Sequence, residues 1–129
     1  MESFTVSTTL PVKPEQIYDA WLSSEGHSRM TGSPAEVDVK VGGEFQAWDG
    51  YIWGKTRIME PHRRIVQAWR TSEFPEESPD SQVEILLEKV PDGTKITLKH
   101  TGIPDGQGDS YKKGWEDFYF TPMRAYFSE

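Results

Sequence analysis

The stretch "VGGEFQAWDGYIWGKTRI", residues 41–58, alternates apolar and polar side chains on both sides of an Asp-Gly step. Such alternation is typical of half-buried β-strands, and Asp-Gly is among the strongest short-range signals for a hairpin turn. The stretch therefore predicts two antiparallel strands, at 44–48 and 51–59, joined by a two-residue turn at Asp49-Gly50. One face of this hairpin, which we expect to point inward, carries Phe45, Ala47, Ile52, Gly54, Thr56 and Ile58.

The other face of the hairpin carries the charged side chains and should therefore face water. Trp48, Tyr51 and Trp53 share this face, so we expect them to be largely exposed and to form a candidate surface for a protein partner. Two other interpretations stay open. A bulge or longer turn could bury a ring, or the three rings could be ordinary cross-strand packing on an exposed hairpin.

The same periodicities extend outward along the chain. They predict a strand at 3–10, a helix within 11–24, a second short helix at 24–30, further strands at 35–41, 64–71, 82–90 and 94–101, and a helix at 109–129. Short hairpin connections favour an antiparallel sheet, and the final helix is the obvious cover for its apolar face. The sequence thus predicts one α+β domain over residues 1–129, with about six to seven strands and one or two short helices after the first strand.

The final helix carries its apolar side chains at three- and four-residue spacing. Tyr111, Trp115, either Phe118 or Tyr119, and Met123 form this stripe. Pro122 lacks a backbone donor and clashes with the preceding turn, so it should kink or locally break the helix.

The inward face of the sheet combines small side chains with polar ones at its centre. This combination favours a ligand pocket between the sheet and the final helix. An equally open alternative is a packed core in which large side chains fill the space and Gln67 and His100 form local hydrogen bonds. The candidate cavity residues are Phe45, Ala47, Ile52, Gly54, Thr56, Gln67, Trp69, Ile85, His100, Trp115, Tyr119 and Met123.

Residues with catalytic or metal-binding chemistry are scarce. The sequence contains no cysteine, which excludes disulfides, thiolate metal sites and a cysteine nucleophile. The three histidines lack metal-ligand spacing, so we expect no metal and no cofactor. His100 is the best candidate for proton transfer, but a lone inward histidine is more often structural, and we assign no catalytic residue.

Charge and hydropathy restrict the partners. The formal net charge of −7 disfavours nucleic acid and anionic membranes. No stretch approaches the ~18 apolar residues of a membrane-spanning helix, and residues 1–10 lack a signal-peptide pattern. We therefore expect a cytoplasmic protein that does not insert into membranes. The sequence does not indicate an oligomeric state.

Three segments together resemble a known family: "GGEFQAWDGYIWGKTRIMEPHRRIVQAWR" (42–70), "VEILLEKVPDGTKITLKHTGIP" (83–104) and "GWEDFYFTPMRAYF" (114–127). Their order and spacing are similar to those of the activator of 90-kilodalton heat-shock protein ATPase family. The matching features are Gly42-Gly43, Phe45, Asp49-Gly50, Gly54, Pro61, Ile65, Trp69-Arg70, Gly93-Thr94, His100 to Pro104, Gly114-Trp115 and Tyr119.

The resemblance implies a START-like, helix-grip fold, in which a curved antiparallel sheet grips the long C-terminal helix around a cavity. Eukaryotic co-chaperones of this family carry an additional N-terminal domain, and the chain resembles only their C-terminal domain. The sequence and the resemblance together leave three functions open. The first is non-enzymatic binding of a small apolar or aromatic ligand. The second is a co-chaperone-type protein-binding module in a stress response, and the third is a cyclase- or hydrolase-type enzyme.

Overall fold

The computed structural model describes residues 1–128 and contains one seven-stranded antiparallel sheet. The strand order is β1-β7-β6-β5-β4-β3-β2. The strands are β1 (Glu2–Leu10), β2 (Glu36–Val37), β3 (Glu44–Ala47), β4 (Ile52–Glu60), β5 (Arg64–Thr71), β6 (Ser81–Val90) and β7 (Gly93–Ile103). The helices are α1 (Pro14–Trp21), α2 (Ser24–Thr31), α3 (Gly108–Trp115), the π-helix η1 (Glu116–Phe120) and α4 (Thr121–Phe127). The predicted α+β class and antiparallel sheet are confirmed.

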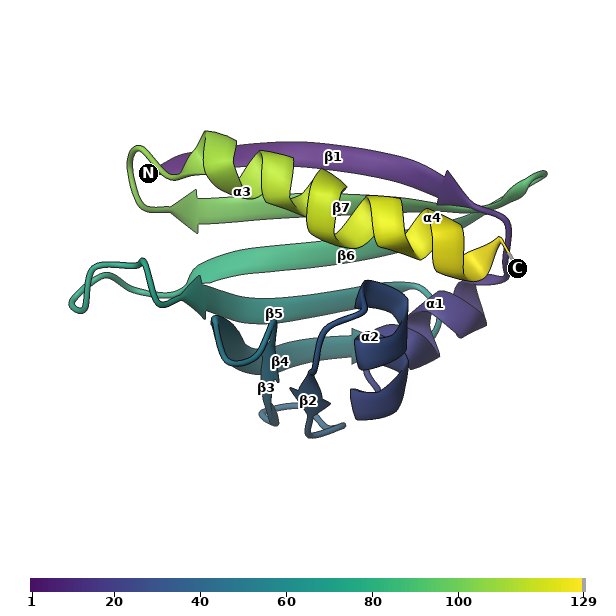
Figure 1. The fold of residues 1–129 in the computed structure, drawn as a ribbon, viewed down its shortest axis with the longest axis horizontal. Coiled ribbons are helices and arrows are strands. Elements are labelled where there is room, and N and C mark those ends of the chain that lie inside the picture. The colour runs from purple at the N-terminus through teal and green to yellow at the C-terminus, as the bar shows by residue number, and fades with distance from the viewer. Residues whose placement is uncertain (129) are drawn as a thin grey trace.

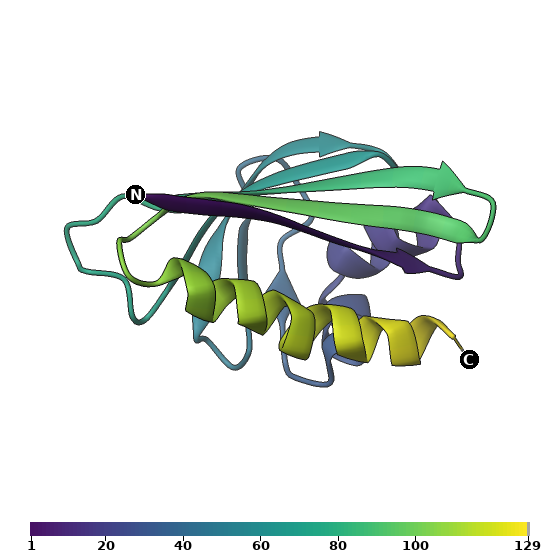
Figure 2. The same ribbon diagram turned by 90° about the horizontal axis from the view of Figure 1, so that it is seen from above.

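The C-terminal segments α3, η1 and α4 run end to end and lie along one side of the sheet (Figure 1). Seen from above, β2, β3 and the start of β4 curl down beside this helix, so the sheet is strongly curved (Figure 2). None of the helices in residues 1–128 is long and apolar enough to cross a membrane.

The core lies between the sheet and the C-terminal helix and is rich in tryptophan. Trp69 on β5 and Trp115 on α3 are 4% and 3% exposed, and their ring centroids lie 5.6 Å apart. Trp21 from α1 stacks on Trp115, with ring centroids 6.1 Å apart. The predicted inward position of Trp69 and Trp115 is confirmed.

The short helices follow their local sequence signals. Pro14 opens α1, where its missing N–H costs nothing. The Ser23 hydroxyl accepts a hydrogen bond from the Gly26 N–H at 3.0 Å and so caps α2, which ends at Gly32 with a φ of +81°. These helices place Trp21 and His27 against the C-terminal helix.

The predicted strand at 35–41 is wrong beyond its first residues. Only Glu36–Val37 pairs with β3, and Val39 and Val41 are 57% and 62% exposed. The chain turns here instead, and a Cβ on Gly43 would lie 2.3 Å from the Asp38 carbonyl oxygen. The valines alternate as they would in a strand. The strand nevertheless ends early, because Gly43 permits a close backbone contact.

The predicted turn at Asp49-Gly50 is present and the register is right, but the two strands end one residue earlier than predicted. The last pair of the ladder is Ala47–Ile52, so residues 48–51 form a four-residue loop. Trp48, Asp49 and Gly50 have φ values of +54°, +57° and +87°. The Tyr51 N–H donates to the Trp48 carbonyl at 3.2 Å and closes the turn, but the left-handed conformation of Trp48 takes both residues out of the ladder.

The C-terminal helix departs from α-helical geometry just before Pro122. The Thr121 N–H donates to the Glu116 carbonyl, the i→i−5 pattern of a π-turn. Pro122 cannot donate to the carbonyl of Phe118, and the wider π-turn accommodates this missing bond without ending the helix. The predicted local break is therefore a single π-helical segment.

Candidate functional site

A hollow of about 390 Å³ lies between hairpin loop 48–51 and the helix α3–η1. We call it the hairpin pocket. Seven of its ten lining residues are aromatic, and the full set is Trp48, Tyr51, Ile52, Trp69, Ser110, Tyr111, Gly114, Trp115, Phe118 and Tyr119. Its volume lies at the lower end of the range for small-molecule sites.

One side of the hairpin pocket is a helix face with four-residue spacing. Ser110, Gly114 and Phe118 recur on this face, and none of the three is among the candidate cavity residues of the sequence analysis. A Cβ on Gly114 would meet only the Phe118 ring, at 3.8 Å, so the missing side chain contributes open space. Their i, i+4, i+8 spacing, with a glycine at the centre, was the sequence pattern that could have predicted this open helix face.

Trp48 is half-buried, and the expectation that it faces solvent is wrong. Its ring packs edge-on against Phe118 with centroids 5.3 Å apart. Its indole Nε1 is buried without a hydrogen-bond partner among the described residues. The longer hairpin loop causes this placement, and a φ of +54° is a costly conformation for so bulky a residue.

Tyr51 and Trp53 are 36% and 40% exposed, as predicted, but they do not form one surface. The Tyr51 ring lines the hairpin pocket, and its hydroxyl donates to the Glu73 carboxylate. Trp53 instead borders a shallow hollow beside β2 and β3. Trp48 and Tyr51 therefore line the hairpin pocket, whereas Trp53 lies on the β2–β3 side of the hairpin.

Replacing Trp53 by glutamine should change the free energy of unfolding by no more than about 1 kcal/mol, the scale of one cross-strand pair. The ring is 40% exposed, so its removal leaves no buried cavity. Urea denaturation of wild type and variant measures the difference. A loss of several kcal/mol would show that the ring carries core packing.

The centre of the sheet–helix layer is packed rather than hollow. A Cβ on Gly54 would lie 1.8 Å from the Ala68 carbonyl oxygen and 3.0 Å from the Phe45 ring, so the glycine admits close packing. Of the candidate cavity residues, Ile52, Trp69, Trp115 and Tyr119 line the hairpin pocket. The others are buried away from its wall: Phe45, Ala47, Gly54, Thr56, Gln67, Ile85, His100 and Met123.

Gln67 has its polar atoms satisfied inside this packed centre. Its Oε1 accepts from the Trp21 indole N–H at 3.2 Å, and its Nε2 donates to the Thr56 hydroxyl at 3.1 Å. Both ends of the Gln67 amide are thus bonded locally, as the packed-core interpretation holds.

His100 is fully buried in a hydrogen-bond arrangement that fixes its tautomer. The Ser81 hydroxyl donates to the Trp69 carbonyl at 2.7 Å, so it can only accept the His100 Nε2–H at 2.9 Å. His100 Nδ1 then accepts from the Trp115 indole at 3.1 Å. Burial lowers the pKa of His100 to about 3, and the ring is neutral. With no acid or base bonded to it, His100 has a structural arrangement, as the alternative interpretation holds.

His27 forms a second buried arrangement behind the pocket. Its Nδ1–H donates to the Trp21 carbonyl at 3.0 Å, so its Nε2 accepts from the Tyr119 hydroxyl at 2.8 Å. Burial lowers the pKa of His27 to about 4. No cluster of three histidine or carboxylate side chains with metal-binding potential occurs in residues 1–128.

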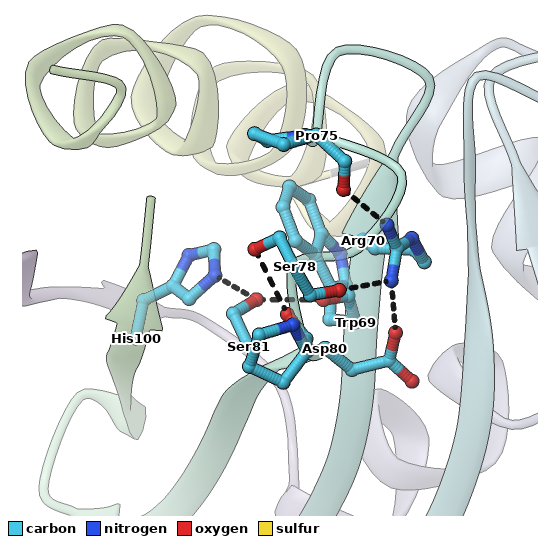
Figure 3. A network of polar contacts seen from close by, with 8 residues as sticks. Trp69, Arg70, Pro75, Ser78, Asp80, Ser81 and His100 are labelled. Carbon is cyan, nitrogen blue, oxygen red and sulfur yellow. Dashed lines mark hydrogen bonds and ion pairs between the residues drawn. The ribbon is translucent and has the colours of Figure 1, made fainter. Parts of the chain in front are cut away.

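Arg70 fixes the loop between β5 and β6 through its guanidinium group (Figure 3). Its guanidinium donates to the carbonyl oxygens of Ser78 and Pro75 at 2.9 and 3.1 Å and pairs with Asp80 at 2.9 Å. Phe74 of the same loop packs on Trp69. The loop is thereby held with Glu73 beside Tyr51.

A curved antiparallel sheet wrapped on a long C-terminal helix, with an apolar pocket at their open edge, defines a helix-grip domain. The chain belongs to the family described as Activator of Hsp90 ATPase homolog 1-like protein, which matches residues 11–128. The family resemblance seen in the sequence is therefore confirmed.

Individual relatives agree with this membership. The human Activator of 90 kDa heat shock protein ATPase homolog 1 is 26% identical over 123 residues, covering 95% of this chain and 36% of the relative. Mouse homolog 2 is 29% identical over 111 residues, covering 86% and 33%. The crystal structure of an HSP90 activator from Plasmodium falciparum has a TM-score of 0.87 and 28% identity, covering 97% of this chain and 95% of that one. The chain thus spans about a third of the length of the curated relatives it matches.

Proposed function

We propose that this chain is a co-chaperone-type domain that binds an Hsp90-class chaperone through the rim of the hairpin pocket. Family membership, and relatives whose names describe activators of the Hsp90 ATPase, support the choice of partner. We propose binding alone and not stimulation of the chaperone's ATPase, because this chain spans only 36% of the length of the human relative.

The observation that carries the proposed surface is the exposure of aromatic rings around one opening. Phe118 is 55% exposed and Tyr51 36%, on opposite sides of the pocket. Exposed aromatic side chains next to a concave site are typical anchors of protein interfaces.

Calorimetric titration with an Hsp90-class chaperone from the same organism tests this surface. Phe118→Ser should weaken binding by about tenfold or more, since an interface anchor loses its apolar contact. Val39→Ser removes another exposed apolar side chain, on the loop after β2, and should leave the affinity unchanged. Equal losses in both variants, or no binding by wild type, would contradict the proposal.

The hairpin pocket favours a second candidate function, the binding of a small apolar or aromatic ligand. Its volume of about 390 Å³ and its seven rings support this function. The pocket lies at the edge of the sheet–helix layer, so the ligand site is proposed there and not around Gly54 and His100.

Gly114→Leu is designed to fill the hairpin pocket without harming the fold. The position is helical and open on the pocket side, and leucine favours helix more than glycine does. We expect the neutral dye N-phenyl-1-naphthylamine to bind wild type saturably, with at least about tenfold weaker binding to Gly114→Leu. Gly114→Ala is the matched control, and equal dye affinity in all three proteins would refute the pocket site.

A further inference from the structure

We propose that the hairpin pocket selects an organic cation, a quaternary or alkylated ammonium group, over a neutral group of the same shape. This inference rests on the proposal that the pocket takes a ligand. Three features carry it: the aromatic wall, one carboxylate held at the rim without a neutralising partner, and the net charge of the chain.

The wall of the pocket is built almost entirely from ring systems. Three tryptophans, three tyrosines and Phe118 contribute to it, and among the described residues no lysine or arginine does. The face of each ring carries the negative part of its quadrupole and attracts cations. Trp69, Tyr111 and Trp115 pack closely, with centroids 5.1 and 5.6 Å from Trp69, so the wall is pre-formed.

Glu73 places a carboxylate at the rim of this wall. It accepts a hydrogen bond from the hydroxyl of Tyr51, a ring of the pocket. Its backbone is fixed from both sides, because its N–H donates to the Thr71 hydroxyl at 3.1 Å and its carbonyl accepts from Gln107 at 3.0 Å. In the part of the chain that the structure describes, Glu73 forms no ion pair.

The neighbouring cation cannot neutralise Glu73. Arg70 is engaged by Asp80 and by two loop carbonyls on the other side of the same loop. The chain as a whole carries a net charge of −7, which attracts cations toward the carboxylate.

Desolvation decides which cation suits the pocket. A lysine-type ammonium is compact and strongly hydrated, so it loses much solvation in an apolar hollow. A quaternary ammonium spreads its charge over methyl groups, and aromatic cages recognise such groups by cation–π attraction. The predicted class is therefore a bulky organic cation with an apolar surface.

Choline and its uncharged carbon isostere, 3,3-dimethylbutan-1-ol, test this selection directly. Amide shifts of Ser110 and Gly114 follow each titration. Wild type should bind choline at least about fivefold more tightly than the alcohol, within the range of cation–π and rim-charge contributions. Glu73→Gln keeps an acceptor for Tyr51 and removes the charge, so it should reduce this preference to about twofold or less and leave the alcohol affinity unchanged.

Glu15→Gln is the matched control, because it removes one exposed carboxylate on α1, at the opposite end of the sheet from the β5–β6 loop (Figure 1). Its preference for choline should equal that of wild type. Equal or tighter binding of the alcohol to wild type would overturn the cation selection while leaving the ligand proposal intact. If neither compound binds and the neutral dye also fails, both proposals fall.

Discussion

Replacing Trp115 by alanine is expected to lower the free energy of unfolding by about 3–5 kcal/mol. The side chain is 3% exposed and packs against Trp21, Trp69 and Tyr119, with ring centroids at 6.1, 5.6 and 4.7 Å. The change also removes the indole N–H that donates a hydrogen bond to His100 Nδ1. The buried acceptor is then unsatisfied, which further lowers the free energy of unfolding.

Urea denaturation near neutral pH measures this loss. Trp115→Phe is the informative companion, because it keeps a ring but removes the N–H, and its loss should fall between wild type and alanine. Midpoints for Trp115→Ala close to that of wild type would mean that the ring does not belong to the core.

The protein should lose stability as the pH falls from about 6.5 toward 4. His27 and His100 are buried and neutral, with pKa values lowered to about 4 and about 3, below the ordinary value of 6.5. Between these values the unfolded chain binds protons that the folded chain does not, so acid favours unfolding. The stabilisation is complete above about pH 6.5 and declines below it.

Each of these histidines can contribute up to about 1.4 kcal/mol per pH unit across this window. Unfolding free energies measured at intervals between pH 7 and 5 give the slope, and carboxylates titrate mostly below that range. His27→Gln should reduce the slope whatever its effect on stability at neutral pH. His62→Gln, at an exposed turn, is the control. A flat profile in wild type would contradict the buried neutral state of both rings.

The sequence predicts the sheet well, because alternation directly reports which side chains leave water. The register of the 44–59 hairpin and the inward position of Trp69 rest on such alternation, the inward position of Trp115 rests on helical spacing, and all three are confirmed. It fails at 35–41, where Val37, Val39 and Val41 alternate but the bend at Gly43 ends the strand.

The hairpin pocket is harder to predict, because two irregular backbone segments form it. The four-residue loop turns Trp48 inward, which an Asp-Gly step alone does not indicate. The π-turn before Pro122 decides between Phe118 and Tyr119, which helical spacing leaves open. Tyr119 is 3% exposed and Phe118 55%, so Phe118 becomes the rim residue. Both irregularities depend on tertiary contacts and have no strong local signal.

The central claim, that this domain binds an Hsp90-class chaperone through the hairpin pocket's rim, is tested most directly by mapping the contact on the domain itself. The measurement is a titration of isotope-labelled protein with the chaperone, followed through backbone amide signals. We expect the largest changes at residues 48–51 and 110–118, and little change on the exposed strand residues Lys95 and Lys99. Changes centred on Lys95 and Lys99, or no changes at a saturating chaperone concentration, would contradict the claim.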